Sequence, residues 1–124
     1  MFRVIIAGGR DFSDYDLLSR TMDKLLSEIN DDITIVCGMA RGADSVGEKY
    51  AITKGYAIDY HQAEWDKFGK SAGYRRNVEM AERADALVAF WDGSSKGTKH
   101  MIDTAYKYGL KVRVVRYKQE GINK

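Results

Sequence analysis

The sequence contains no proline, one cysteine and two histidines. A single cysteine, Cys37, excludes an intrachain disulfide, and His61 and His100 do not supply the ligand spacings of a structural zinc site. We therefore expect no metal and no cofactor, and we expect both histidines at the surface. The chain also lacks an excess of charge of one sign, with 20 basic and 18 acidic residues. Its bulk charge therefore gives no reason to expect nucleic-acid binding.

Long hydrophobic runs are absent as well. A membrane-spanning helix needs about 20 apolar residues, and the opening MFRVIIAGGR lacks the basic flank of a secretion signal. We therefore expect a cytoplasmic protein with no membrane partner. A length of 124 residues fits one domain with its own core. The sequence predicts a single domain over residues 1–124, with 118–124 as a flexible polar tail.

Short apolar runs alternate with amphipathic, helix-type patterns along the chain. The runs predict strands over 2–7, 33–37, 56–60, 86–91 and 111–117. Helices are predicted from an N-cap at Ser13 through Ile29, and over 42–54, 71–83 and 98–108, with 61–69 as a polar connection. This alternation indicates an α/β fold. We predict a Rossmann-like parallel sheet of about five strands in the order 3-2-1-4-5, with helices on both faces.

Glycine-containing loops follow the strands that end near residues 7, 37 and 91. They are Gly8 to Arg10, Gly38 to Asp44, and Asp92 to Thr98, and a parallel sheet brings such loops together at its carboxyl edge. Glycines let a phosphate approach the backbone, and a helix N-terminus adds amide donors. The loops therefore predict a nucleotide site.

The residue types in these loops suit different parts of a nucleotide. Arg10, Arg41 and Lys96 can neutralise phosphate charge, and Thr98 stands at the start of a predicted helix. Asp44 suits ribose or base donors, or alternatively caps its own helix.

Two well-known phosphate motifs are absent. The dinucleotide pattern G-x-G-x-x-G fails after the first strand, where the residues are GGRDFS. The P-loop pattern fails because Glu64 stands where the motif before Gly69-Lys70-Ser71 needs glycine. Ordinary NAD binding and P-loop ATP hydrolysis are therefore not expected.

Side chains outside the glycine loops complete the predicted site. Asn77 shares an inward helical stripe with Met80, and Trp91 ends a buried strand, where it either stacks on a base or packs. The predicted ligand-binding residues are Gly8, Gly9, Arg10, Gly38, Arg41, Gly42, Ala43, Asp44, Arg76, Asn77, Trp91, Gly93, Ser95, Lys96, Gly97 and Thr98.

The segments GGRDF, GMARGAD, GKSAGYRRNVEM and WDGSSKGT occur in this order over nearly the whole chain. With them the chain resembles the SLOG superfamily, in particular its YspA/YpsA-related branch. It is distantly similar to the DNA-processing protein DprA and to the Lonely guy phosphoribohydrolases of that superfamily. The resemblance implies a Rossmann-like domain that binds nucleotides or nucleotide-derived ligands.

The phosphoribohydrolases of this superfamily carry an RKxxM helix segment and a PGGxGTxxE loop with a catalytic glutamate. Arg76, Asn77 and Met80 match the first pattern with asparagine in place of lysine, and Gly97-Thr98 match the GT of the second. Met101 stands where the glutamate belongs. The resemblance therefore leaves enzyme activity open.

The leading hypothesis is a nucleotide-binding module that senses or sequesters its ligand. The alternative is an N-glycoside hydrolase acting on nucleoside 5′-monophosphates, for which Asp44, Asp92 and Glu79, or else Asp11, would supply the acid or base. Single-stranded DNA binding is a third hypothesis, disfavoured by the low net charge. A homodimer is plausible, with Trp65 or Tyr74 as contacts, and Trp65 could equally serve as a lid.

Overall fold

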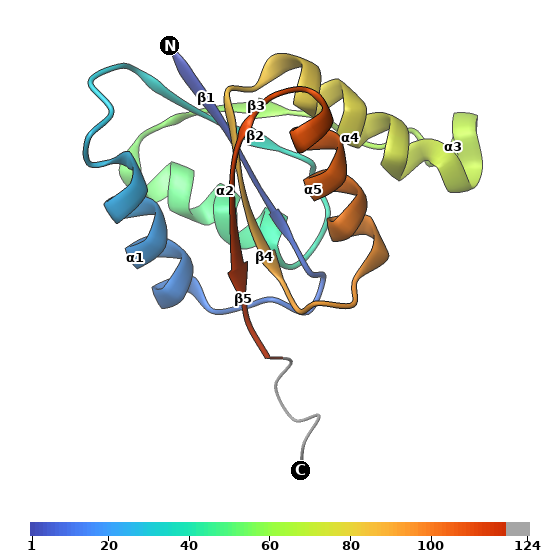
Figure 1. Cartoon of the computed structure of the whole chain (residues 1–124), viewed down its shortest axis with the longest axis horizontal. Coiled ribbons are helices and arrows are strands. Elements are labelled where there is room, and N and C mark those ends of the chain that lie inside the picture. The colour runs from blue at the N-terminus through green and yellow to red at the C-terminus, as the bar shows by residue number, and fades with distance from the viewer. Residues whose placement is uncertain (119–124) are drawn as a thin grey trace.

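The computed structural model describes residues 1–118, so most of the predicted tail, 119–124, lies outside the described residues. Figure 1 shows the elements in the order β1 (Phe2–Gly8), α1 (Tyr15–Leu26), β2 (Ile33–Cys37), α2 (Ala43–Lys54), β3 (Ala57–Tyr60), α3 (Trp65–Phe68), the 3-10 turn η1 (Gly69–Ser71), α4 (Ala72–Arg83), β4 (Ala86–Trp91), α5 (Lys96–Lys107) and β5 (Lys111–Arg116). All neighbouring strands are parallel, in the order β3-β2-β1-β4-β5. The predicted Rossmann-like fold and strand order are confirmed.

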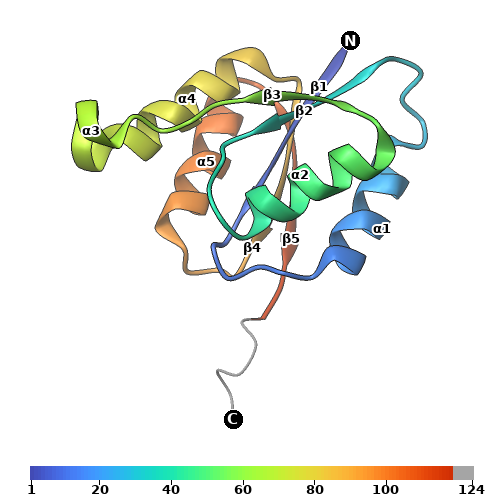
Figure 2. The ribbon, with the colours of Figure 1, turned by 180° about the vertical axis from the view of Figure 1, so that it is seen from behind.

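The sheet lies between two helical layers, with α1 and α2 on one face and α4 and α5 on the other (Figures 1 and 2). Successive side chains of β1 alternate between the two cores: Val4 packs with the α1 and α2 layer, and Ile5 with the α4 and α5 layer. A strand buried on both faces needs apolar residues at every position. This explains the continuous apolar run that predicted β1.

Three helix boundaries, two in α1 and one in α5, differ from the sequence prediction. The predicted N-cap at Ser13 is wrong, because the Asp14 carboxylate caps α1 by accepting the Leu17 N–H at 3.0 Å. Helix α1 ends at Leu26, and Ile29, predicted within it, packs on the core from the following loop. Helix α5 begins at Lys96 rather than Thr98, because the Ser95 hydroxyl accepts the Thr98 N–H at 3.4 Å.

The segment predicted as a polar connection, 61–69, contains the short helix α3, which continues into η1 and α4. Figures 1 and 2 show α3 projecting beyond the sheet at the N-terminal end of α4. A helix of this length is too short to leave a periodic pattern in the sequence.

The surface position expected for His61 is wrong, since its side chain is only 7% exposed. Its ring lies between two carboxylates, with Nδ1 2.7 Å from Glu79 Oε1 and Nε2 3.1 Å from Asp59 Oδ2. Arg3 and Arg83 contact the same Asp59 oxygen at 3.2 Å each. These contacts tie α4 to β1 and β3.

Replacing Asp59 by asparagine is expected to lower the free energy of unfolding by about 1 to 2 kcal/mol at pH 7. Partial burial raises the pKa of Asp59, but hydrogen bonds from His61 and Arg83 outweigh it and lower the pKa below 3.8. This stabilisation is present above that value and is lost as the pH falls through the lowered pKa. Urea titrations at pH 7 and at about pH 3 should therefore show the difference between wild type and variant shrinking in acid.

The exposed pair of Lys99 and Asp103, 2.8 Å apart on α5, provides the control. Asp103→Asn should change stability by less than about 0.5 kcal/mol. Equal losses for Asp59→Asn and Asp103→Asn would contradict a special role of the His61 cluster.

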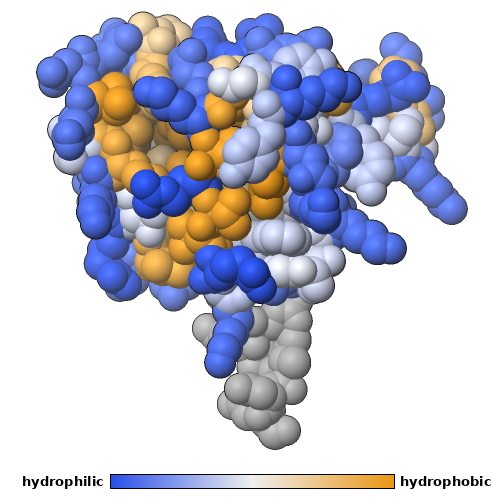
Figure 3. All heavy atoms as spheres, in the orientation of Figure 1, coloured by the Kyte–Doolittle hydropathy of each residue, from blue (hydrophilic) through white to orange (hydrophobic). Residues whose placement is uncertain are grey.

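Apolar side chains gather between α1 and β5 around a hollow on one face of the molecule (Figure 3). A cavity of about 280 Å³ lies there, lined by Phe2, Leu25 and Ile29 among others and flanked by Lys111 and Arg113. Exposed apolar patches are typical of association surfaces. The homodimer stays a prediction, and this patch is a candidate contact surface for it besides Trp65 and Tyr74. None of the helices within residues 1–118 has the length and apolar character needed to cross a membrane.

Candidate functional site

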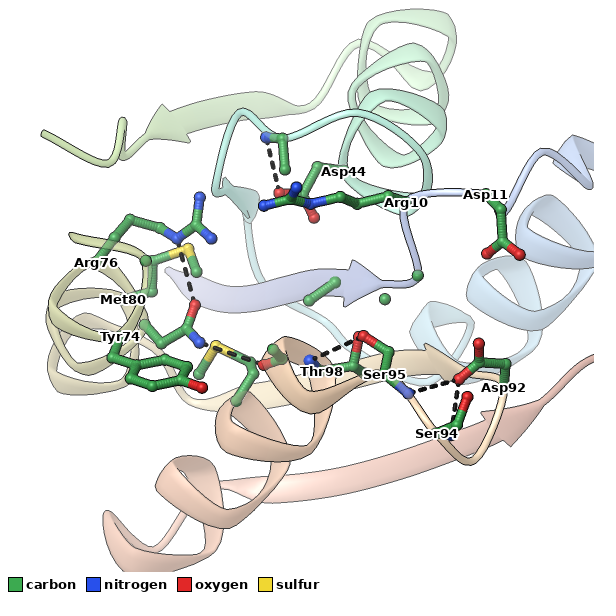
Figure 4. A pocket seen from close by; sticks show the side chains of 18 of the residues that line it. Arg10, Asp11, Asp44, Tyr74, Arg76, Met80, Asp92, Ser94, Ser95 and Thr98 are labelled. Carbon is green, nitrogen blue, oxygen red and sulfur yellow. Dashed lines mark hydrogen bonds between the residues drawn. The ribbon is translucent and has the colours of Figure 1, made fainter. Parts of the chain in front are cut away.

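A cleft of about 610 Å³ lies at the carboxyl edge of the sheet, between β1 and β4. The strand order reverses at this position, because the chain winds outward from β1 through β2 and β3 and then returns to place β4 on the other side. Open parallel sheets bind ligands at such a point. The loops after β1 and β4 line the cleft together with residues of α4 and α5 (Figure 4).

The loops after β1 and β2 are packed directly on one another. The Gly9 carbonyl accepts the Ala43 N–H at 3.1 Å, and the Gly9 N–H donates to the Phe90 carbonyl of β4 at 3.0 Å. Gly42 has φ +78° and lies so close that an added Cβ would meet Gly9 O at 2.2 Å. These contacts fix the position of the backbone that carries Arg10 at the mouth of the cleft.

The loop after β4 is ordered by its own aspartate. Asp92 Oδ1 accepts the N–H groups of Ser94 at 2.8 Å and Ser95 at 2.9 Å (Figure 4). These hydrogen bonds lower the pKa of Asp92, so its carboxylate stays ionised at neutral pH. Because α5 makes its first backbone bond from Lys99 N to Ser95 O, the amides of Lys96 and Gly97 precede the helical ladder. Of these two helix N-terminal residues, Gly97 lines the cleft, where an anion could reach its amide.

The buried Asp44 lies near two arginines of the cleft, the half-buried Arg76 and the exposed Arg10. Arg76 donates to the Gly38 carbonyl, and Asp44, 6% exposed, accepts the Ala40 N–H at 3.0 Å. Burial raises the pKa of Asp44, although the Ala40 N–H and the two arginines oppose this rise. Burial likewise lowers the pKa of Arg76, with Asp44 opposing. Figure 4 shows the side chains of Arg10 and Arg76 pointing toward one another.

A chain of hydrogen bonds behind Arg76 fixes its orientation. Arg76 Nε donates to Asn77 Oδ1 at 3.3 Å, so the Asn77 amide nitrogen points to His100 Nδ1, 3.1 Å away. The Nδ1 atom must accept this bond, which makes the imidazole neutral. His100 Nε2 then lies 3.5 Å from Thr104 Oγ1, and the Tyr74 ring stacks on the imidazole with centroids 4.2 Å apart. The surface position expected for His100 is therefore only partly right, because the ring is half-buried.

The neutral state of His100 gives a pH dependence that can be measured. Burial lowers the pKa of His100 below its ordinary value of 6.5, so unfolding takes up a proton between the two values. The contribution to stability is full above pH 6.5 and falls as the pH drops through that window. We expect thermal unfolding of His100→Gln to depend less on pH below 6.5 than that of the wild type. Identical slopes would contradict a buried neutral imidazole.

The structure brings many of the predicted residues to the cleft. Those that line it are Gly8, Gly9, Arg10, Asp44, Arg76, Asn77, Asp92, Ser95, Gly97 and Thr98. Gly38 and Arg41 line an adjoining hollow instead. Glu79 lines neither space and is paired with His61.

Other predicted residues lie beside the cleft and support its loops. Trp91 Nε1 donates to the Ser95 carbonyl at 3.1 Å, and the Arg116 guanidinium lies over the indole ring at 5.4 Å. Gly93 has φ +91° and is covered by the same guanidinium, which an added Cβ would meet at 2.2 Å. Gly42, Ala43 and Lys96 likewise do not line the cleft.

Several lining residues were not among the predicted ligand contacts. Trp65 and Tyr74, predicted as a lid or dimer contacts, lie along the cleft with Lys70, Met80 and Met101. Tyr74 stands two residues before Arg76 in the GKSAGYRRNVEM segment, and this position is the signal that could have indicated it. Ser94 and Asp11 also line the cleft, and Asp11 accepts the Tyr117 hydroxyl at 2.5 Å.

A sequence model of the YspA, cpYpsA-related SLOG family (YAcAr) matches residues 2–68. The chain belongs to this family. The matched residues of this SLOG protein contain the loops after β1 and β2, whereas α4 and the loop after β4 lie beyond them.

Gene 61 protein of Mycobacterium phage D29 is 36% identical over 121 residues, which cover 90% of this chain and 94% of the phage protein. A predicted subunit of a tRNA methyltransferase from Methanocaldococcus jannaschii aligns with a TM-score of 0.48 at 10% identity, over 99% of this chain and 71% of that one.

Within residues 1–118 of this SLOG protein, no group of three or more His, Cys, Asp or Glu side chains is arranged to hold a metal ion. Met101, at the position of the phosphoribohydrolase glutamate, is buried and lines the cleft. The cleft therefore holds cationic, amide and apolar groups, with Asp44 as its buried carboxyl group.

Proposed function

We propose that this protein binds a nucleotide or nucleotide-derived ligand in the cleft and acts as a sensor or sequestering module. The observation that carries the proposal is the convergence of Arg10 and Arg76 beside the buried Asp44, across from the N-terminus of α5. Guanidinium groups and helix N-terminal amides together form a typical environment for phosphate. A buried carboxylate next to them suits the hydroxyl or amino donors of a ribose or base.

The remaining walls of the cleft suit a nucleoside. Tyr74 and Met80 line it from α4, and Met101 lines it from α5. One face of the Tyr74 ring is already stacked on His100, which holds the ring in a fixed orientation. A fixed aromatic ring beside methionine side chains is a suitable surface for a planar base.

Isothermal titration calorimetry with nucleoside mono-, di- and triphosphates of the common bases tests the proposal, with inorganic phosphate as the reference ligand. We expect saturable binding of at least one nucleotide at one site per chain, tighter than that of phosphate. Arg10→Gln should weaken it, because Arg10 supplies charge to the site and makes no ion pair within residues 1–118. Failure of every nucleotide to bind would refute the proposal.

Hydrolysis of an N-glycosidic bond is the second function that the site could support. It is favoured by the raised pKa of Asp44, since a protonated carboxyl group can donate to a leaving base. It is opposed by Met101, which stands at the position of the catalytic glutamate of the phosphoribohydrolases. Chromatography for free base after incubation with each monophosphate decides between the two. We expect no release, whereas release that disappears in Asp44→Ala would favour the enzyme.

A further inference from the structure

The hollow between α1 and β5 lies on a part of the sheet that the helices of residues 1–118 leave uncovered (Figures 1 and 3). Val112 and Val114 of β5 pack with the α4 and α5 layer. Because side chains alternate along a strand, Lys111, Arg113 and Val115 are directed to the α1 side, where Val115 packs on the core. Both cations are exposed and line the hollow, so its rim on β5 is basic.

The opposite rim of the hollow, on α1, is acidic. Leu25 and Ile29 line the hollow there, and both are only partly buried. The Ile29 N–H donates to the Leu26 carbonyl at 3.1 Å, so the chain keeps a helical turn beyond the end of α1. Residues three apart on such a turn share one side, which places the exposed Glu28 next to Leu25.

The charges of the two rims have no partner of opposite sign within the described chain. Lys111, Arg113 and Glu28 make no ion pair with any residue of 1–118. A two-fold rotation about an axis through the hollow exchanges the rims, so the acidic rim of one copy meets the basic rim of the other. A partner of uniform charge, such as a nucleic acid, would be repelled by one of the rims. The surface is therefore complementary to itself.

We propose that a second copy of this chain docks on this face, with the hollows of the two copies opposed and Glu28 of each copy against Arg113 of the other. An apolar centre within a charged rim is the usual composition of such an interface. The opposite charges determine the register of the two copies. Residues 119–124, QEGINK, contain one apolar side chain and are poorly suited to fill the hollow. The hollow and the cleft share no lining residue, so the dimer leaves the cleft open.

Sedimentation equilibrium of the full chain at several concentrations tests the proposal. We expect the wild type to reach twice the mass of one chain. Arg113→Glu places two carboxylates together at each rim, and Glu28→Lys places two cations together. Each variant alone should weaken the dimer at least about tenfold, and both change only exposed side chains.

An equimolar mixture of the two variants distinguishes contacts between copies from effects within one chain. In a mixed dimer of Arg113→Glu with Glu28→Lys, both rims again join opposite charges. We expect the mixture to dimerise within about threefold of the wild-type affinity, although neither variant does so alone. A mixture that stays as weak as its components would overturn the proposed docking.

The apolar centre is tested by Leu25→Glu, with Ile52→Glu as its control. Ile52 is 65% exposed on α2 and lies outside the hollow. Leu25→Glu should abolish the dimer and Ile52→Glu should leave it intact, with circular dichroism to check the fold of each. A wild type that stays monomeric up to about 1 mM would overturn the proposal. A dimer that none of the Leu25, Glu28 and Arg113 variants weakens would also overturn it, because the copies would then meet through another face.

Discussion

Replacing Gly42 by alanine is expected to destabilise the protein by about 3 to 5 kcal/mol. Gly42 has φ +78°, and an added Cβ would lie 2.2 Å from Gly9 O and 2.5 Å from Arg10 Cα. Both neighbours are backbone atoms, so no side-chain rotation can relieve the overlap. The loops after β1 and β2 would have to separate, which breaks the bond from Ala43 N–H to Gly9 O. Urea denaturation followed by circular dichroism measures the loss.

The variant Gly55→Ala distinguishes the two causes of this loss, which are the positive φ and the overlap of the added Cβ with backbone atoms. Gly55 has φ +77°, nearly that of Gly42, but an added Cβ there would meet nothing within 4 Å. Gly55→Ala should therefore cost only about 1 kcal/mol, the price of the left-handed conformation alone. Gly42→Ala should also weaken nucleotide binding because Arg10 moves with its loop, whereas Gly55→Ala should not. Similar stability losses in the two variants would contradict the close packing of the loops.

The central strands could be predicted from the sequence because burial on both faces leaves a strong local pattern. β1, β2 and β4 are buried on both faces, so each reads as a continuous apolar run. Alternation with amphipathic helices then leaves few topologies, since parallel crossovers are right-handed. Helix α2 was equally well marked, with Gly42 before it and Gly55 in the left-handed region after it.

Helix ends were harder because neighbouring residues compete for the same role. Ser13 and Asp14 are both good N-caps, and only the structure shows that Asp14 accepts the Leu17 N–H. Ser95 and Thr98 present the same ambiguity at α5. Such choices depend on small differences in free energy that tertiary packing decides.

The loops of the site could be predicted, but the directions of their side chains could not. Topology brings strand ends together at one edge, which correctly placed Arg10 and Asp44 near each other. It does not determine that Asp92 turns back on its own loop amides, or that Trp91 holds the Ser95 carbonyl. Arg76 reaches Gly38 across 38 residues of sequence, and no local pattern reports such a contact.

Replacing Arg76 by alanine is expected to weaken nucleotide binding at least about 100-fold. The change removes a cation from the boundary of the cleft and takes the donor from the Gly38 carbonyl. It also removes a charge that opposes the rise in the pKa of Asp44, so this carboxyl group would titrate at higher pH. The affinity of the variant, measured by calorimetry, should then fall further as the pH is lowered, because a protonated Asp44 no longer accepts hydrogen bonds with both oxygens.

Arg75 provides the matched control on the same helix. Its guanidinium lies 4.2 Å from the Phe68 ring centroid, and its Nε donates to Ser71 Oγ, away from the cleft. Arg75→Ala should leave binding unchanged, since it removes the same charge from a neighbouring position without touching Gly38, Asn77 or Asp44. Arg76→Lys keeps the charge but cannot reproduce the planar contacts to both Gly38 and Asn77, so we expect a loss of about tenfold. Thermal melting of each variant checks that the fold is retained. If Arg75→Ala and Arg76→Ala weakened binding equally, the effect would come from overall charge, and the cleft would not be the binding site.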